Sequence, residues 1–110
     1  MKLVKCIVRP DKVEETTDAL KQLDLSGITV THVGGRGTKP NPKGVYRLME
    51  YEVRYLPHMM IDVVVADAVV DDVVRLVMET ARTGKKGDGR VFVMPVEQAY
   101  TIRTRAGGPD

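Results

Sequence analysis

The chain has 110 residues, a length that suits one domain with a single core. With 43% hydrophobic and 29% charged residues its composition is that of a globular protein, although it contains no tryptophan and one phenylalanine. A net charge of +2, scattered basic residues and few aromatic side chains argue against nucleic-acid binding.

Cysteine usage and the charged residues within apolar runs indicate a cytoplasmic protein. Cys6 is the single cysteine, so a disulfide within the chain is impossible. Its apolar neighbours favour a buried structural side chain over a catalytic thiol, since nothing nearby would stabilise a thiolate. Charged residues interrupt the first apolar run, which argues against a signal peptide. The longest apolar region, 59–70, carries Asp62 and Asp67 and is not expected to insert into a membrane.

The first third of the chain predicts a strand, a helix and a second strand. Alternation of apolar and other residues predicts a strand over 3–9. A proline followed by an acidic residue suits the first turn of a helix, which should extend from residue 10 to about 24. A second strand is expected over 28–33. The face of the first strand that should be buried carries Val4, Cys6 and Val8.

A segment rich in glycine and proline follows, and no regular pattern returns until about residue 55. A structureless loop of ~20 residues is uncommon in a compact domain and is usually functional or disordered. Tyr46, Tyr51 and Tyr55 lie in its second half, where tyrosine suits contact with a partner protein.

The second half predicts a third strand over 58–65 and a helix over about 68–81 that Asp67 caps. A fourth strand is expected over 91–95, and 98–103 is expected to extend as a strand or hairpin arm. The tail, about 104–110, is expected to be flexible. The helix has the clearest apolar stripe of the chain, all of it expected in the core: Val70, Val73, Val74, Val77 and Met78.

The order of elements predicts an α+β fold of the ferredoxin-like βαββαβ type, with one domain over 1–110 and a long loop between strands two and three. Both helices cover the same face of the sheet in this fold. The other face carries Leu3 and Ile7, so it must be covered, and oligomerisation is the simplest way to cover it.

Residues 83–90, Thr-Gly-Lys-Lys-Gly-Asp-Gly-Arg, are the strongest candidate for a ligand site. Glycines allow backbone N–H groups to approach an anion, and lysine and arginine add positive charge. The alternative is a solvated turn, which the composition alone does not exclude. A Walker A loop is excluded, because no Gly-Lys-Ser/Thr closes the segment.

The surrounding motifs resemble the PII signal-transduction family over essentially the whole chain. The most specific match is its C-terminal signature, which here consists of Thr83, Gly87, Asp88, Gly89, Arg90, Val91, Phe92 and Val93. Further matches are Arg9-Pro10, Gly27 with Thr29-Val30-Thr31, Gly35, Gly37, Tyr46-Arg47, Glu50-Tyr51, Leu56-Pro57 and Ile102-Arg103-Thr104.

The resemblance implies a homotrimer whose three intersubunit clefts bind ADP, AMP or ATP as regulatory ligands, with a phosphate-binding loop at about 82–90. It implies that an effector loop at about 37–55 contacts a membrane transporter or a metabolic enzyme, and that Tyr51 is a possible modification site. No metal ligand is assigned, and a role for Mg²⁺ is left open. The implied nucleotide-binding residues are Ile7, Thr29, Gly35, Arg36, Gly37, Thr38, Asp62, Val64, Gly87, Asp88, Gly89, Arg90 and Arg103.

The chain departs from the family pattern at positions that join nucleotide to 2-oxoglutarate. Thr38-Lys39 stands where the family commonly has Arg-Gln, His58 where it has lysine, and Thr101 where it has a second arginine. We therefore expect weak or absent 2-oxoglutarate binding, and ADP or AMP that competes well with ATP, although Arg36 and Lys39 are expected to compensate in part. His58 is either a pH or anion sensor or a simple substitution at a partly exposed strand start.

The sequence thus predicts a regulator without enzymatic activity that signals through residues 37–55, with a link to inorganic-carbon (bicarbonate) metabolism as one possibility. The alternative is a conventional nitrogen-regulatory PII protein that acts on an ammonium channel or a nitrogen-assimilation enzyme. A small enzyme with interfacial clefts is a weaker hypothesis, since no nucleophile–base pair or carboxylate pair is evident. A purely structural interaction domain is the third hypothesis.

Overall fold

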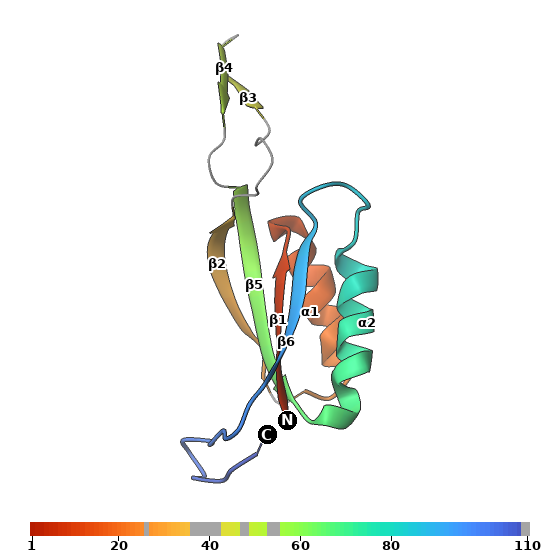
Figure 1. Ribbon diagram of the computed structural model, residues 1–110, viewed down its shortest axis with the longest axis vertical. Helices are drawn as coiled ribbons and strands as arrows, with labels where there is room; N and C mark the ends of the chain where they lie inside the picture. The colour runs from red at the N-terminus through yellow and green to blue at the C-terminus, as the bar shows by residue number, and fades with distance from the viewer. Residues whose placement is uncertain (26, 36–42, 47–48, 53–55, 109–110) are drawn as a thin grey trace.

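The computed structural model describes residues 1–25, 27–35, 43–46, 49–52 and 56–108. It consists of a four-stranded antiparallel sheet with two helices on one face (Figure 1). The strand order is β2-β5-β1-β6, which is the ferredoxin-like arrangement predicted from the order of elements. The elements of this body are β1 (Lys2–Val8), α1 (Val13–Lys21), β2 (Thr29–Gly35), β5 (Leu56–Val65), α2 (Val70–Ala81) and β6 (Gly89–Pro95).

The core lies between the sheet and the helices, and β1 supplies its centre. Val4 and Cys6 are fully buried and Val8 is 1% exposed, as the alternation of the strand predicts. Burial, and secondarily the Asp62 carboxylate, raises the pKa of the Cys6 thiol to about 12, which fits the structural role predicted for it. Opposing core residues are Ile61, Val63 and Val65 from β5, Thr16 and Leu20 from α1, and Val73, Val77 and Ala81 from α2.

Both helices are shorter than predicted, because each begins with a 3₁₀ turn: η1 (Pro10–Lys12) before α1, and η2 (Asp67–Val69) before α2. At its end α1 gives way to i→i−3 hydrogen bonds, such as Leu23 N to Leu20 O at 3.0 Å. Asp24 then adopts a left-handed conformation with φ of 54°, which no longer continues a helix.

Two expectations about α2 were wrong. Asp67 makes no capping hydrogen bond to the helix; its carboxylate instead accepts one from Lys2 Nζ at 3.2 Å. Met78 is 56% exposed, whereas Val73 and Val77 of the same stripe are buried. The stripe spans a wider arc than the sheet covers, so Met78 is left at its edge beside β6.

The interval between β2 and β5 contains more regular structure than predicted. Residues Lys43–Tyr46 (β3) and Met49–Glu52 (β4) form a two-stranded antiparallel hairpin, which lies beyond the end of the sheet where β5 begins (Figure 1). The body strands are also longer than expected, with Gly35 paired to Leu56. Paired strands therefore extend to the base of the predicted effector loop, and the remaining residues of that loop lie outside the described ones.

The sheet face away from the helices carries exposed apolar side chains, including Phe92 (41% exposed) and Met94 (37%). In its middle Lys5 Nζ lies 3.5 Å from Asp62 Oδ1. That another subunit covers this face of the sheet stays a prediction.

After β6 the chain forms a short hairpin with an isolated antiparallel bridge between Tyr100 and Gly107, which agrees in part with the strand or hairpin arm expected for 98–103. Thr101 N donates to Ala106 O at 2.8 Å and Gly108 N to Ala99 O at 3.0 Å, so hydrogen bonds extend well into the tail. The mobility of that tail stays a prediction. No helix among the described residues is long and apolar enough to cross a membrane.

Candidate functional site

The glycine loop, residues 82–88, joins the end of α2 to the start of β6 and has a backbone that requires glycine at several positions. Gly84, Gly87 and Gly89 have φ of 85°, 98° and 105°. The constraint is tightest at Gly89, where a Cβ would lie 1.7 Å from the carbonyl oxygen of Ile7. The glycines predicted from the sequence thus shape the loop and let β6 begin directly against β1.

Asp88 is the organising residue of this loop. Its Oδ2 accepts hydrogen bonds from the backbone N–H groups of Thr83 and Gly84, both at 2.9 Å. Its Oδ1 accepts from the Thr83 hydroxyl and from Arg9 Nε, the latter at 3.0 Å. The bond from the Thr83 hydroxyl, supported by the backbone and Arg9 donors, holds the pKa of Asp88 well below its usual range, so the residue is a stable anion.

Arg9 ties the loop to the end of β1. Besides its contact with Asp88, it donates from Nη2 to the carbonyl oxygen of Lys86 at 2.9 Å. Its side chain is 29% exposed and that of Asp88 24%, so the pair is only partly screened by solvent. Arg9 was not among the site residues predicted from the sequence, where Arg9-Pro10 was only one of the matches to the family pattern.

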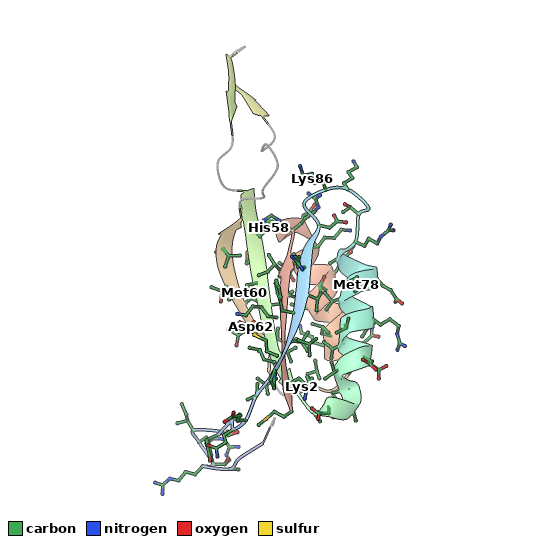
Figure 2. All side chains as sticks on the ribbon, in the orientation of Figure 1. Lys2, His58, Met60, Asp62, Met78 and Lys86 are labelled. Atoms are coloured by element: carbon green, nitrogen blue, oxygen red, sulfur yellow. The ribbon has the colours of Figure 1, made fainter. Side chains whose placement is uncertain are left out.

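His58 ties the same loop to β5. Its Nε2 lies 3.0 Å from the carbonyl oxygen of Gly87. Because a carbonyl oxygen only accepts, Nε2 carries the hydrogen in this contact. The residue is 9% exposed, so the expectation of a partly exposed position was wrong. Figure 2 shows His58 and Lys86 toward one end of the sheet, Lys2 toward the other, and Asp62 between them.

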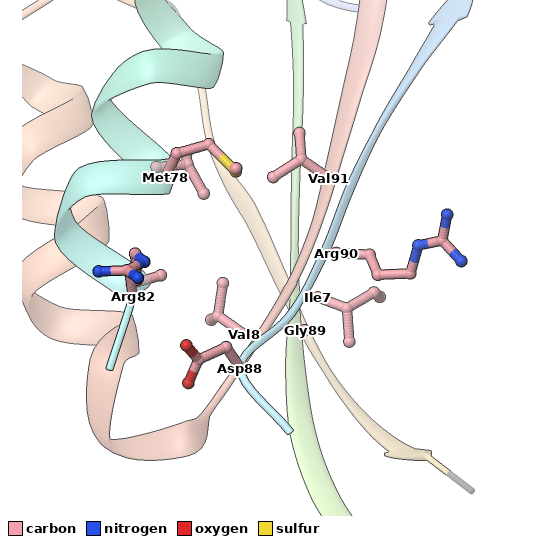
Figure 3. A pocket seen from close by; sticks show the side chains of 10 residues that line it. Ile7, Val8, Met78, Arg82, Asp88, Gly89, Arg90 and Val91 are labelled. Atoms are coloured by element: carbon pink, nitrogen blue, oxygen red, sulfur yellow. The ribbon is translucent and has the colours of Figure 1, made fainter. Parts of the chain in front are cut away.

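A cleft of about 190 Å³ lies between α2 and the start of β6, and Val77, Met78 and Arg82 form its helical wall. Figure 3 shows that Asp88 lies on the same side of β6 as Met78, whereas Ile7 and Arg90 lie on the other side. The Arg90 guanidinium carbon is 5.3 Å from the centre of the Phe92 ring. Arg90 and Ile7 therefore belong to the face of the sheet away from the helices, which we call the open face.

A second cleft, of about 260 Å³, contains three of the predicted nucleotide-binding residues, Thr29, Asp62 and Val64. It also borders the turn after β6 through Tyr100. Asp62 Oδ1 is enclosed and has no hydrogen bond from a described residue; its contact with Lys5 is an ion pair. A third cleft, of about 280 Å³, lies beside Arg9 and His58.

The predicted residues thus form two groups along β1: Ile7 and Arg90 lie near its end, whereas Thr29 and Asp62 lie level with Lys5 at its middle and Val64 lies nearer its start. Ile7 pairs with Arg90, whereas Leu3 pairs with Val64. Four residues of extended chain separate Ile7 from Leu3, which is about 13 Å. The segment that carries Arg103 leaves β6 at the end where Pro95 pairs with Lys2, far from the glycine loop of the same chain.

The remaining assigned residues are described in part or not at all. Gly35 belongs to β2 and Tyr51 to β4, where it pairs with Gly44, but only their backbones are described. Arg36, Gly37, Thr38 and Lys39 lie outside the described residues. The part of the chain that the structure describes contains no group of three His, Cys, Asp or Glu side chains suited to a metal ion.

The family model and the relatives that match this chain all belong to the same family. The family model described as nitrogen regulatory protein P-II matches residues 1–106. The chain is 41% identical over 110 residues to nitrogen regulatory protein GlnK2 of Haloferax mediterranei, which covers all of this chain and 89% of that protein. It is 42% identical to nitrogen regulatory protein GlnK of Escherichia coli over 94% of this chain and 93% of that one. It is 39% identical to nitrogen regulatory protein P-II of Rhodospirillum rubrum, over 100% of this chain and 98% of that protein.

Proposed function

Because the chain belongs to the P-II family of nitrogen regulatory proteins, we propose that it is a trimeric regulator that binds adenine nucleotides between its subunits. In this proposal it acts on a partner transporter or enzyme through residues of about 37–55. Nucleotide binding would shift the equilibrium between conformations of that segment, to the extent that the nucleotide prefers one of them.

The separation of the candidate residues into two groups is the observation that carries the proposal. Ile7, Gly89 and Arg90 lie at one end of the sheet, and Thr29, Asp62 and Val64 border a separate cleft that extends from the middle of the open face toward its other end. In a trimer, the first group of one subunit would meet the second group of its neighbour. The exposed apolar side chains of the open face support such an assembly, since a monomer would leave them in water.

The names of the relatives favour a nitrogen-regulatory role over the link to bicarbonate. Those compared here are nitrogen regulatory proteins, each similar over nearly the full chain. We therefore propose an ammonium channel or a nitrogen-assimilation enzyme as the partner, and a non-enzymatic mode of action.

We retain the prediction that 2-oxoglutarate binds weakly. The His58 imidazole is 9% exposed and bonded to the Gly87 carbonyl, which makes it a poor replacement for a lysine ammonium group directed at a carboxylate. The chain also has fewer cations than the family pattern at the positions that would contact a terminal phosphate. Because each hydrogen bond to a charged group contributes about 1.5–3 kcal/mol, their loss should weaken ATP binding more than ADP binding, so that ADP competes well with ATP.

Calorimetric titration of the purified protein with ADP, AMP and ATP, each with and without Mg²⁺ and 2-oxoglutarate, tests this proposal, together with the mass in solution from light scattering. We expect a trimer that binds ADP and ATP with similar affinity and is insensitive to 2-oxoglutarate. A monomer, or a trimer that binds no adenine nucleotide, would contradict the proposed function and favour a structural interaction domain. ATP hydrolysis with turnover would instead favour an enzyme.

A further inference from the structure

Two consecutive peptide groups of the glycine loop are held by side chains from outside it. The carbonyl of Lys86 accepts from Arg9 Nη2 at 2.9 Å, and the carbonyl of Gly87 is 3.0 Å from His58 Nε2. Arg9 follows β1, and His58 lies near the start of β5, so both anchors belong to the central strands of the sheet. The loop is thereby held by side chains at the ends of the two inner strands of the sheet.

The orientation of a carbonyl also determines that of the next amide. In a trans peptide the C=O and the following N–H point in opposite directions, and no described peptide bond is cis. With the Lys86 carbonyl turned toward Arg9, the Gly87 N–H points away from Arg9. With the Gly87 carbonyl turned toward His58, the Asp88 N–H points away from His58. The two anchors therefore present successive backbone donors on the surface of the loop opposite to them.

In residues 83–85 of the loop, the backbone N–H groups are already used in hydrogen bonds within the loop. The amides of Thr83 and Gly84 already donate to the Asp88 carboxylate, and the amide of Lys85 donates to the Thr83 hydroxyl at 3.1 Å. A phosphate at this turn would also meet the negative charge of Asp88. Asp88 thus acts as an internal anion there, and its bond to Arg9 Nε fixes the guanidinium that orients the Lys86 carbonyl.

From this geometry we infer that Arg9 and His58 are positioning residues for phosphate binding, which act through the Lys86 and Gly87 carbonyls to aim the N–H groups of Gly87 and Asp88 at the ligand. The inference rests on the proposed function, because it concerns the site at which nucleotide phosphates would bind. Neither side chain touches the ligand in this account.

The test compares ADP with adenosine, because only ADP uses the oriented amides. Arg9→Gln removes the fork that spans Asp88 and the Lys86 carbonyl, and His58→Leu removes the ring donor. From the ordinary contribution of such bonds, we expect ADP affinity to fall about tenfold for Arg9→Gln and about threefold to tenfold for His58→Leu. Adenosine affinity, measured by competition, should change less than about twofold, since no amide is used.

His58→Gln is the rescue variant, because its side-chain amide retains an N–H donor near the same place. It should restore ADP affinity to within about twofold of the unmodified protein. Asp18→Asn is the matched control: it removes an exposed carboxylate of α1 that forms an ion pair with Lys21 at 3.6 Å, and it should leave ADP affinity unchanged. Circular dichroism of each variant establishes that it is folded before its affinity is compared.

The outcomes distinguish this inference from the proposed function. If the unmodified protein binds no ADP, the proposed function fails. If it binds ADP but His58→Leu and Arg9→Gln bind equally well, only the positioning role is wrong. Equal losses for ADP and adenosine, or equal losses for His58→Leu and His58→Gln, would also overturn it, since they indicate general damage to the site.

Discussion

Replacement of Gly89 by alanine is the sharpest perturbation of the loop, because it adds one methyl group where the backbone of β1 leaves no room. The new Cβ would lie 1.7 Å from the Ile7 carbonyl oxygen and 2.7 Å from its carbon. Both are backbone atoms within the β1–β6 ladder, where Gly89 pairs with Val8. A rotamer change cannot relieve such a contact, so β6 must move away from β1 at this position.

The expected cost has two parts. A φ of 105° is a conformation that alanine adopts with a strain of about 1–3 kcal/mol. Displacement of the strand end loses one or two ladder hydrogen bonds, at about 0.5–1.5 kcal/mol each. Gly89→Ala should therefore lower the free energy of unfolding by about 1.5–6 kcal/mol, a large fraction of the stability of a domain of this size.

Alanine substitutions at two other glycines allow the cost of backbone strain to be measured separately from the cost of the steric clash. Gly108 has a φ of 111° but nothing within 4 Å of an added Cβ, so Gly108→Ala carries the backbone strain alone. Gly27 has neither a positive φ nor a neighbour within 4 Å, so Gly27→Ala should be close to neutral. Urea unfolding followed by circular dichroism, at one fixed protein concentration, gives the three values. If Gly89→Ala costs no more than Gly108→Ala, the predicted clash with Ile7 is wrong.

Three further predictions follow from single residues. Cys6, whose pKa burial raises to about 12, should resist alkylation in the folded protein at pH 8 and react fully in urea; rapid modification without denaturant would contradict its burial. Asp24→Gly should raise the free energy of unfolding by about 0.5 kcal/mol, because glycine adopts the left-handed φ of 54° without steric cost; a loss in urea unfolding would count against this. Because the folded pKa of Asp88 is depressed, its contribution to loop order is present above the ordinary aspartate pKa and lost only as the pH falls through the folded pKa. Carboxyl NMR should show that the pKa of Asp88 lies well below the ordinary aspartate range, and a midpoint within that range would contradict the hydrogen bonds assigned to its carboxylate.

The body of the fold was predictable because its signals are periodic. The alternation of Val4, Cys6 and Val8 identified the buried face of β1, and Val73 and Val77 identified that of α2. The same rule overestimated the stripe at Met78, because a sequence pattern does not tell where the sheet ends. The hairpin of β3 and β4 was not predicted, because the glycine and proline residues between β2 and β5 indicated a loop without strands.

The contacts of the site were less predictable, since they join residues distant in sequence. Arg9 and Asp88 are 79 positions apart, and His58 and Gly87 are 29 apart. A usable signal was present for Arg9: a cation directly after β1 must lie beside the start of β6 once the two strands are neighbours in a ferredoxin-like sheet. At Asp67 a local signal gave a wrong prediction. Its position before α2 predicted a helix cap, but its carboxylate instead accepts a hydrogen bond from Lys2, which is 65 positions away in the sequence.

A mixed trimer tests most directly the central claim, that each nucleotide site is shared by two subunits. Arg90→Ala removes the cation of one group, and Asp62→Ala removes the carboxylate of the other. Trimers of either variant alone should bind ADP weakly. When the two variants are co-refolded, each mixed trimer contains one cleft with an intact Arg90 from one subunit and an intact Asp62 from its neighbour, so tight ADP binding should reappear at one site per mixed trimer. Binding in the mixture no tighter than in the parent variants would contradict the shared site.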